Sequence, residues 1–336
     1  MKRERPFVLL VLMTVVLFMA GLFMGSVRVP FGETLHVLLG GTATKESWTF
    51  IILHSRIPAS IVALLTGASL ASAGLMLQTA FSNPLAGPDI LGINSGAGLG
   101  VAIVMLAFGG VLPAGASLVG IQFSLVISAF VGALAVTALL LMFSSITKSN
   151  VMLLIIGIML NFIVSSSITL LNFFSTEEGV HSYTMWGMGT FGGVTTDQLP
   201  LFCLLALGGL AVSLSLVKPL NALLLGTHYA ENLGINVRRT RILLLLATGL
   251  LVAVTTAYCG PISFIGLAVP HMARLLLGTT DHKRLMPATL LCGAAVALMC
   301  NLISTLPTGG RLLPLNAITP IIGAPVIIFV ILKDRR

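Results

Sequence analysis

The sequence is poor in charged residues and carries no common catalytic motif. Only 8% of its 336 residues are Asp, Glu, Lys or Arg, whereas soluble globular proteins average about 25%. Hydrophobic residues make up 57% of the chain, which excludes an ordinary soluble domain and indicates a membrane protein. The net charge of +8 does not indicate nucleic-acid binding, because no basic stripe with interleaved aromatic residues occurs.

Motifs for chemistry on a substrate are also missing from the sequence. No GxxxxGK(S/T) loop is present to hold ATP phosphates. No HExxH, GxSxG or aspartate-rich cluster supports a hydrolase or a prenyl-transfer enzyme, and the four cysteines lack metal-ligand spacing. We therefore predict a chain that is not an enzyme and has no catalytic residues, no metal site and no cofactor of its own.

Ten apolar segments are long enough to cross a bilayer, which takes roughly 20 helical residues. Segment 175–197 is too polar to cross and is expected to form a short helix outside the membrane. The first apolar segment lacks a signal-peptide cleavage pattern and is expected to be a retained helix. The sequence therefore predicts an all-α polytopic membrane protein that forms one domain over residues 1–336. The expected spans are 7–25, 57–80, 90–110, 117–143, 151–173, 198–217, 241–259, 262–278, 286–305 and 316–332.

The Lys and Arg residues indicate the direction of the chain. With the N-terminus inside, fourteen of them fall on the inner side and four fall outside, at Arg28, Lys45, Arg56 and Arg311. This is the bias of the positive-inside rule. It predicts that both termini are cytoplasmic and that segment 175–197 is outside.

An inverted internal repeat is indicated by a shift of 182 residues. The shift places Arg56 on Arg238, Thr66-Gly67 on Thr248-Gly249, Leu85-Ala86 on Leu267-Ala268, and Pro88 on Pro270. The two copies, spans 2–5 and 7–10, start five crossings apart, so the second would be upside down. Repeats of this kind are usual in transporters, with the pathway at their interface.

Every Asp and Glu, Asp89 included, falls in or beside a predicted loop. Ion-coupled carriers usually bury carboxylates in mid-span, so this pattern disfavours an ion-coupled secondary transporter, which stays the alternative from a different class. We expect the energy source for transport on another polypeptide.

Segment 218–241 is predicted to form two short helices on the cytoplasmic side. Pro219 can open a helix that Gly226 ends, and Thr227 can cap a second helix that Gly234 closes. Both helices are too short to cross the membrane. Their apolar residues suit docking into a groove on another protein, and an amphipathic linker on lipid headgroups is the alternative. These residues are Leu223, Leu224, Leu225, Tyr229 and Leu233.

The sequence resembles the FecCD-like permease subunits of type II ABC importers for ferric siderophores, haem and vitamin B12. The likeness covers essentially the whole chain in several blocks that occur in the right order. The blocks are "SRIPASIVALLTGASLASAG" (55–74), "QTAFSNPLAGPDILGINSGAGLG" (78–100), "GTFGGV" (189–194), "NALLLGTHYAENLG" (221–234), "GPISFIGLAVPHMARLLLGTTDHKRLMP" (260–287) and "IGAPVIIFVILK" (322–333).

The resemblance implies a permease subunit in the bacterial inner membrane. Its expected partners are a second copy of the chain, two cytoplasmic ATPase subunits that bind ATP and Mg, and an extracytoplasmic substrate-binding protein. The expected cargo is a metal chelate, either a ferric siderophore or haem, with cobalamin as the alternative. No nucleic-acid partner is expected.

The resemblance also implies roles for particular residues. It assigns ATPase coupling to segment 218–241, at Leu223, Leu224, Leu225, Gly226, Tyr229, Glu231, Leu233 and Gly234. It assigns Arg56 to a pair with a carboxylate of the binding protein, and an arginine that snorkels to the interface is the alternative. The family's frequent second arginine is Ala59 here, and another is replaced by Thr305, with Arg311 six residues later.

The cytoplasmic gate of the family aligns with "ITKSNV" (146–151), which suggests Ser149, Asn150 and Val151 as gate residues, and a generic turn is the alternative. In the eighth span, Pro270, His271 and Arg274 are expected to serve helix packing and the inner mouth, and contact with the substrate is the alternative. His271 or Arg274 could bond the carbonyl that Pro270 frees. Three glycines are expected to allow close helix packing beside the pathway; they are Gly92, Gly96 and Gly100.

Overall fold

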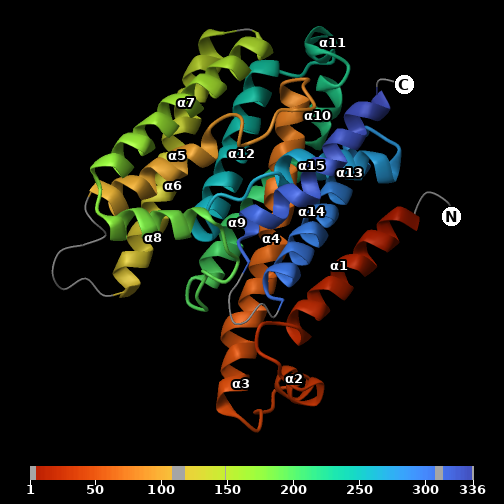
Figure 1. Cartoon of the computed structure of the whole chain (residues 1–336). Coiled ribbons are helices and arrows are strands. Elements are labelled where there is room, and N and C mark those ends of the chain that lie inside the picture. The colour runs from red at the N-terminus through yellow and green to blue at the C-terminus, as the bar shows by residue number, and fades with distance from the viewer. Residues whose placement is uncertain (1–4, 108–117, 148, 307–312, 335–336) are drawn as a thin grey trace.

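The computed structural model describes residues 5–107, 118–147, 149–306 and 313–334. Within these ranges the secondary structure is helical and contains no strand (Figure 1). Six helices are long and apolar enough to span a membrane by themselves, and α9 with α10 forms a bent pair that could count as a seventh. The six are α1 (Arg5–Phe23), α4 (Ile57–Ala80) with the turns before it, α6 (Leu118–Ile146), α7 (Asn150–Phe174), α12 (Val237–Cys259) and α14 (His282–Ser304).

The other predicted spans correspond to shorter or bent apolar helices. The bent pair is α9 (Leu199–Ser215) with α10 (Val217–Leu223), which meet at 48°. The rest are α5 (Ile93–Ala102) with its π-helical end η2 (Ile103–Ala107), α13 (Ile265–Leu277) and α15 (Leu315–Asp334). Each of the ten expected spans thus has a helix, which confirms the predicted all-α polytopic fold.

Span eight is shorter than the sequence predicts, and the predicted end of span three lies outside the described residues. At 1.5 Å per residue, the 13 residues of α13 reach only about two-thirds of a hydrocarbon core of about 30 Å. Non-helical joints precede both helices, residues 81–92 before α5 and residues 260–264 before α13. Irregular backbone at membrane depth is tolerated only where protein or a water-filled cavity surrounds it.

The packing of the helices repeats between the two halves of the chain. Helix α4 packs against α14, and α12, its counterpart in the second half, packs against α6. A side chain at Gly67 would overlap the backbone of Gly293, and one at Gly249, 182 residues later, would overlap Thr137. Helix α4 runs from α2 and α3 toward α10, whereas α12 starts beside α11 and runs the opposite way (Figure 1). This arrangement supports the predicted inverted repeat.

The inside of the bundle is rich in small and polar residues, and its outside is apolar. Thr66, Ser69 and Ser72 of α4 are fully buried, whereas Phe162 and Phe173 of α7 are 63% and 80% exposed. Membrane helices approach one another closely through small residues, because lipid tails offer no hydrophobic gain for burying larger apolar ones. The distribution is the one expected of a protein surrounded by lipid.

The two ends of the bundle carry different elements. The start of α1, the end of α15, α10 and α11 (Thr227–Asn232) lie toward one end, which we call the coupling end (Figure 1). The opposite end carries α2 (Phe31–Leu38) and α3 (Glu46–Ile51), and α8 (Glu177–Gly187) follows the end of α7 that lies lower in the view. The segments that the charge rule assigns to the cytoplasm therefore share an end.

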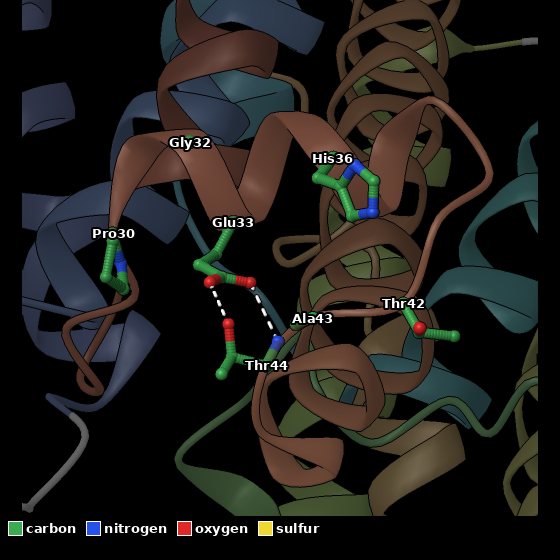
Figure 2. A pocket seen from close by; sticks show the side chains of 7 residues that line it. All are labelled: Pro30, Gly32, Glu33, His36, Thr42, Ala43 and Thr44. Carbon is green, nitrogen blue, oxygen red and sulfur yellow. Dashed lines mark hydrogen bonds between the residues drawn. The ribbon is translucent and has the colours of Figure 1, made fainter.

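Helices α2 and α3 were not predicted; they lie between the first two expected spans, 7–25 and 57–80. Figure 2 shows how α2 holds the chain after it: the Glu33 carboxylate accepts hydrogen bonds from the Thr44 hydroxyl and from the Thr44 backbone N–H, the latter at 2.9 Å. The Thr44 hydroxyl and N–H hold the pKa of Glu33 below its ordinary value. The stability that these bonds add is therefore present above the ordinary pKa and is lost as pH falls through the lowered one.

Candidate functional site

The two broken joints of the repeat lie against each other, and Asp89 connects them. One carboxylate oxygen of Asp89 accepts the backbone N–H of Phe264 at 3.3 Å, and the other accepts the side-chain amide of Asn94. The Thr256 hydroxyl in turn donates to Asn94 Oδ1 at 2.7 Å. Phe264 holds a left-handed backbone with φ of 69°, which is uncommon for a residue other than glycine and marks a site held by its surroundings.

A polar cavity of about 280 Å³ opens beside this connection. Its volume lies just below the roughly 300–1,000 Å³ of pockets that bury a drug-sized ligand, so in one chain it can hold a group of a large cargo but not the whole. Burial raises the pKa of Tyr183 to about 12, so the phenol stays protonated at neutral pH. The lining residues are Asp89, Asn94, Ser95, Gly98, Ser165, Ile168, Tyr183, Pro261 and Ser263.

Sequence reasoning missed the position of Asp89. The residue does lie in a non-helical joint, as expected, but this joint packs against the start of α13 within the bundle. A carboxylate enclosed between the helices of a membrane protein is a candidate functional site. The signal was available in the sequence, because paired Gly/Pro-interrupted segments in two repeats point to a transport site.

A second polar group lies where α13 meets the end of α4. Arg274 Nη1 donates to Gln78 Oε1 at 2.8 Å, and Gln78 Nε2 donates to the carbonyl of Leu267 at 3.1 Å. His271 Nε2 lies 2.9 Å from the carbonyl oxygen of Pro84. These contacts hold α13 to α4 and to the joint after it, in keeping with the packing role predicted for His271 and Arg274.

The carbonyl that Pro270 frees lies against a glycine of α4. That carbonyl belongs to Gly266, four residues before the proline. It lies directly against Gly74 of α4, where any side chain would overlap it. Close Cα–H···O contacts of this kind recur at helix interfaces, so Gly74 lets α4 approach this carbonyl closely.

A network that the sequence did not reveal ties α10 to the rest of the coupling end. Asn221 of α10 donates to Asp281 Oδ1 at 2.6 Å and accepts the backbone N–H of His282 at 2.8 Å. The buried His282 ring places Nε2 at 2.9 Å from the Thr79 hydroxyl on α4. Bonds from the Lys283 N–H and Asn221 lower the pKa of Asp281. Asn221 and His282 thus link α10 to the start of α14 and to the end of α4.

The coupling segment forms the two short helices that were predicted. Gly226 and Gly234 follow α10 and α11 with positive φ of 99° and 80°. Leu223 is 8% exposed and packs inside, so its expected place on a docking surface was wrong. The exposed apolar residues, which we call the coupling patch, are Leu224, Leu225, Tyr229 and Leu233. Glu231 lies 4.0 Å from His228 Nδ1 beside them.

The structure gives Arg56 a different task from the docking that was expected. Arg56 is 7% exposed, and its guanidinium donates to the carbonyls of Leu22 at 2.9 Å, Phe23 at 3.1 Å and Val27 at 2.6 Å. Leu22 and Phe23 end α1, and terminal carbonyls of a helix lack partners within it. Arg56 therefore fastens the end of α1 to the start of α4 and is enclosed rather than presented to another protein.

Comparison with known proteins shows where this architecture belongs. The model of the FecCD transport family matches residues 12–333. The chain belongs to the FecCD transport family. The vitamin B12 import system permease protein BtuC of Klebsiella pneumoniae subsp. pneumoniae is 36% identical over 333 residues, which cover 97% of this chain and 93% of that protein. BtuC of Citrobacter koseri is 39% identical over 284 residues, which cover 84% and 82%.

A solved structure agrees with this assignment. An ABC transporter assigned to the metal-chelate type, in an inward-facing conformation, matches with a TM-score of 0.84 at 30% identity and covers 98% of this chain and 99% of that one. This FecCD permease is thus the multi-pass membrane subunit of a bacterial inner-membrane ABC importer. ABC permeases act with ATPase subunits and a binding protein. Family membership, rather than a shortage of buried carboxylates, now disfavours an ion-coupled carrier.

The expected gate of the FecCD permease lies at the start of α7. The Ser149 hydroxyl accepts the backbone N–H of Met152 at 3.3 Å and caps the helix. Val151 is 66% exposed, and the side chain of Asn150 lies outside the described residues, as does Arg311. The gate role of these residues stays a prediction.

The three glycines of α5 lie in close helix contacts. A side chain at Gly100 would overlap the Ser128 carbonyl, and one at Gly96 would overlap α6. Gly92 begins α5 with φ of 76° against Asn161 of α7. These positions fit the packing role that was predicted for them.

Proposed function

We propose that this FecCD permease forms a homodimer and that its first cargo to test is cobalamin, with ferric siderophores and haem as the alternatives. The observation that supports cobalamin as the cargo is the likeness to vitamin B12 permeases, at 36% and 39% identity over most of both chains. The sequence predicted a ferric siderophore or haem as the cargo, with cobalamin as the alternative, and these relatives favour cobalamin. Cobalamin is itself a bulky metal chelate, so the class of cargo is unchanged.

The geometry supports a second copy of the chain. The Asp89 cavity measures about 280 Å³, too small for a whole chelate, and one wall of it is α7. That helix also presents a long apolar face without a partner among the described residues, which a second copy can cover. Its exposed residues include Val151, Met152, Ile155, Met159, Phe162, Ile163, Leu170, Phe173 and Phe174.

The cargo is tested in proteoliposomes that contain the permease, its co-purified ATPase and its binding protein. We expect ATP-dependent uptake of labelled cobalamin. Unlabelled cobalamin should inhibit this uptake by competition, whereas haem or a ferric trihydroxamate should not. Uptake of haem or ferric siderophore without cobalamin would overturn the cargo assignment and leave the importer function intact. Crosslinking of a single cysteine on the α7 face across two copies tests the homodimer separately.

Coupling to the ATPase rests on the coupling patch. Leu233 is 57% exposed, so Leu233→Asp should fold normally yet abolish pull-down of the ATPase, because burying an unpaired carboxylate in a docking groove costs several kcal/mol. Leu35→Asp, at a 41% exposed leucine of α2 on the opposite end, is the matched control and should bind the ATPase normally. Undiminished pull-down with Leu233→Asp would remove the patch from the docking surface.

The orientation is tested by cysteine labelling in a background without the native cysteines. Ser182 on α8 and Ser149 before α7 are both exposed. An impermeant reagent should modify Ser182→Cys from outside intact cells, and Ser149→Cys only in inside-out vesicles. The reverse pattern would place the coupling end outside and refute the predicted cytoplasmic termini.

A further inference from the structure

A cavity of about 550 Å³ lies at the coupling end, between the end of α6, helix α11 and the start of α12. It is separate from the Asp89 cavity and is not needed for the proposed cargo path. Its lining residues are Ser144, Ser145, Thr147, Thr227, His228, Glu231, Val237, Arg238 and Arg241. Hydroxyl and guanidinium groups thus face one space from three elements.

The charge of this lining is positive. Arg238 and Arg241 contribute +2 and Glu231 contributes −1, which leaves +1 while His228 is neutral. Glu231 lies 4.0 Å from His228 Nδ1, so its carboxylate faces the histidine ring as well as the cavity. Arg238 is exposed, whereas Arg241 is half-buried and also interacts within the protein.

These donors suit a phosphate. A guanidinium presents a planar fork that matches phosphate oxygens, and such charge-assisted bonds are among the strongest available. The hydroxyls of Ser144, Thr147 and Thr227 can donate to the oxygens that the arginines leave free, whereas the Ser145 hydroxyl donates to the Met142 carbonyl at 2.6 Å. A neutral or cationic ligand would gain nothing from the two arginines.

The surroundings favour a lipid phosphate over a free one. Leu134, Leu141 and Ser145 recur at spacings of seven and four residues, so they lie on one face of α6. Ser145 lines the cavity, and Leu134 and Met142, on the adjoining part of this face, are exposed by 37% and 49%. An acyl chain can therefore lie along α6 while the headgroup enters the cavity, and basic pockets between helices on the cytoplasmic side bind anionic headgroups.

We propose that this cavity binds the phosphate of an anionic phospholipid from the leaflet at the coupling end. The lipid sits between α11, which carries part of the coupling patch, and the end of α6, which leads to the predicted gate. When the cavity is occupied, the bound lipid contacts both α11 and the end of α6 and so links them. The site depends on neither the cargo nor the homodimer.

The test uses the full chain, purified in detergent and titrated with phosphatidylglycerol, with bound lipid counted by native mass spectrometry. Arg238→Gln combined with Arg241→Gln should weaken phosphatidylglycerol binding at least about tenfold, because two charge-assisted bonds are lost. The single variants Arg238→Gln and Arg239→Gln form the matched pair: each removes one positive charge from an exposed arginine, but only Arg238 lines the cavity. Phosphatidylcholine, which carries no net charge, should bind weakly to every variant.

Four outcomes would overturn the proposal. Unchanged phosphatidylglycerol binding in the double variant would show that the cavity is not the site, and an equal loss with Arg239→Gln would show attraction to surface charge alone. Displacement of the lipid by millimolar inorganic phosphate would identify free phosphate as the ligand. Loss of bound lipid on adding the ATPase would identify an acidic group of that partner. If the double variant fails to fold, the single variant Arg238→Gln replaces it in the test, because Arg238 is exposed.

Discussion

Arg56→Glu should remove most of the folded permease from the membrane rather than weaken docking of the binding protein. The change deletes three hydrogen bonds to the carbonyls of Leu22, Phe23 and Val27 and places a carboxylate against them. Leaving such buried acceptors unsatisfied costs about 1–3 kcal/mol each, so we expect a loss of roughly 3 kcal/mol or more. Abundance in membranes and thermal unfolding in detergent measure it.

The matched control is Arg28→Glu, which reverses the charge of an exposed arginine at the same end and should leave stability unchanged. The stability of Arg56→Lys should lie between that of the wild type and that of Arg56→Glu, because one ammonium lacks the planar fork that reaches several carbonyls at once. Titrating labelled binding protein against the permease that does fold separates the two roles. Normal abundance with weakened docking would restore Arg56 to the docking surface.

Asp89→Asn should reduce transport by an order of magnitude or more while the protein still reaches the membrane. The amide keeps one acceptor oxygen but turns an NH2 group toward a donor, either the Phe264 N–H or the Asn94 amide, both of which now donate to the carboxylate. The two joints lose part of their connection and the cavity loses its charge. A charge-assisted bond is worth about 1.5–3 kcal/mol, which corresponds to a change of about tenfold or more.

Asp89→Leu should in addition lower stability, because it leaves both donors without a partner. Asp197→Asn, at an exposed carboxylate of the opposite end, is the control and should transport normally. Uptake per folded permease and ATP hydrolysis are measured together, so that a defect in the path is distinguished from a defect in coupling. Wild-type uptake by Asp89→Asn would exclude Asp89 from the pathway.

The elements of this fold follow from local sequence, and that part could be predicted. The long apolar segments predicted the spans. The Lys and Arg bias predicted that the two ends of the chain lie on the same side, and Pro219, Gly226 and Gly234 predicted the two coupling helices. Helices α2 and α3 were missed because they are short and lie in a polar stretch. A search for amphipathic segments would have found "FGETLHVL" of α2.

Contacts between distant residues could not be predicted. Leu223 and Leu224 are neighbours in an apolar run, yet one is 8% exposed and the other 45%, because only the packing of α10 decides which faces inward. Arg56 meets carbonyls some 30 residues earlier, and Asn221 meets Asp281 and His282 about 60 residues later. No periodicity in a single sequence encodes such pairs, so polar side chains near helix ends were assigned to partners outside the chain.

The central claim is that this permease supplies a path and separate ATPases supply the free energy. The most direct test compares two energy sources in one set of proteoliposomes that hold the permease, its ATPase and the cargo-loaded binding protein. We predict cargo uptake when ATP is present on the ATPase side, and none from an imposed proton or sodium gradient without ATP. Gradient-driven uptake by the permease alone would contradict the account.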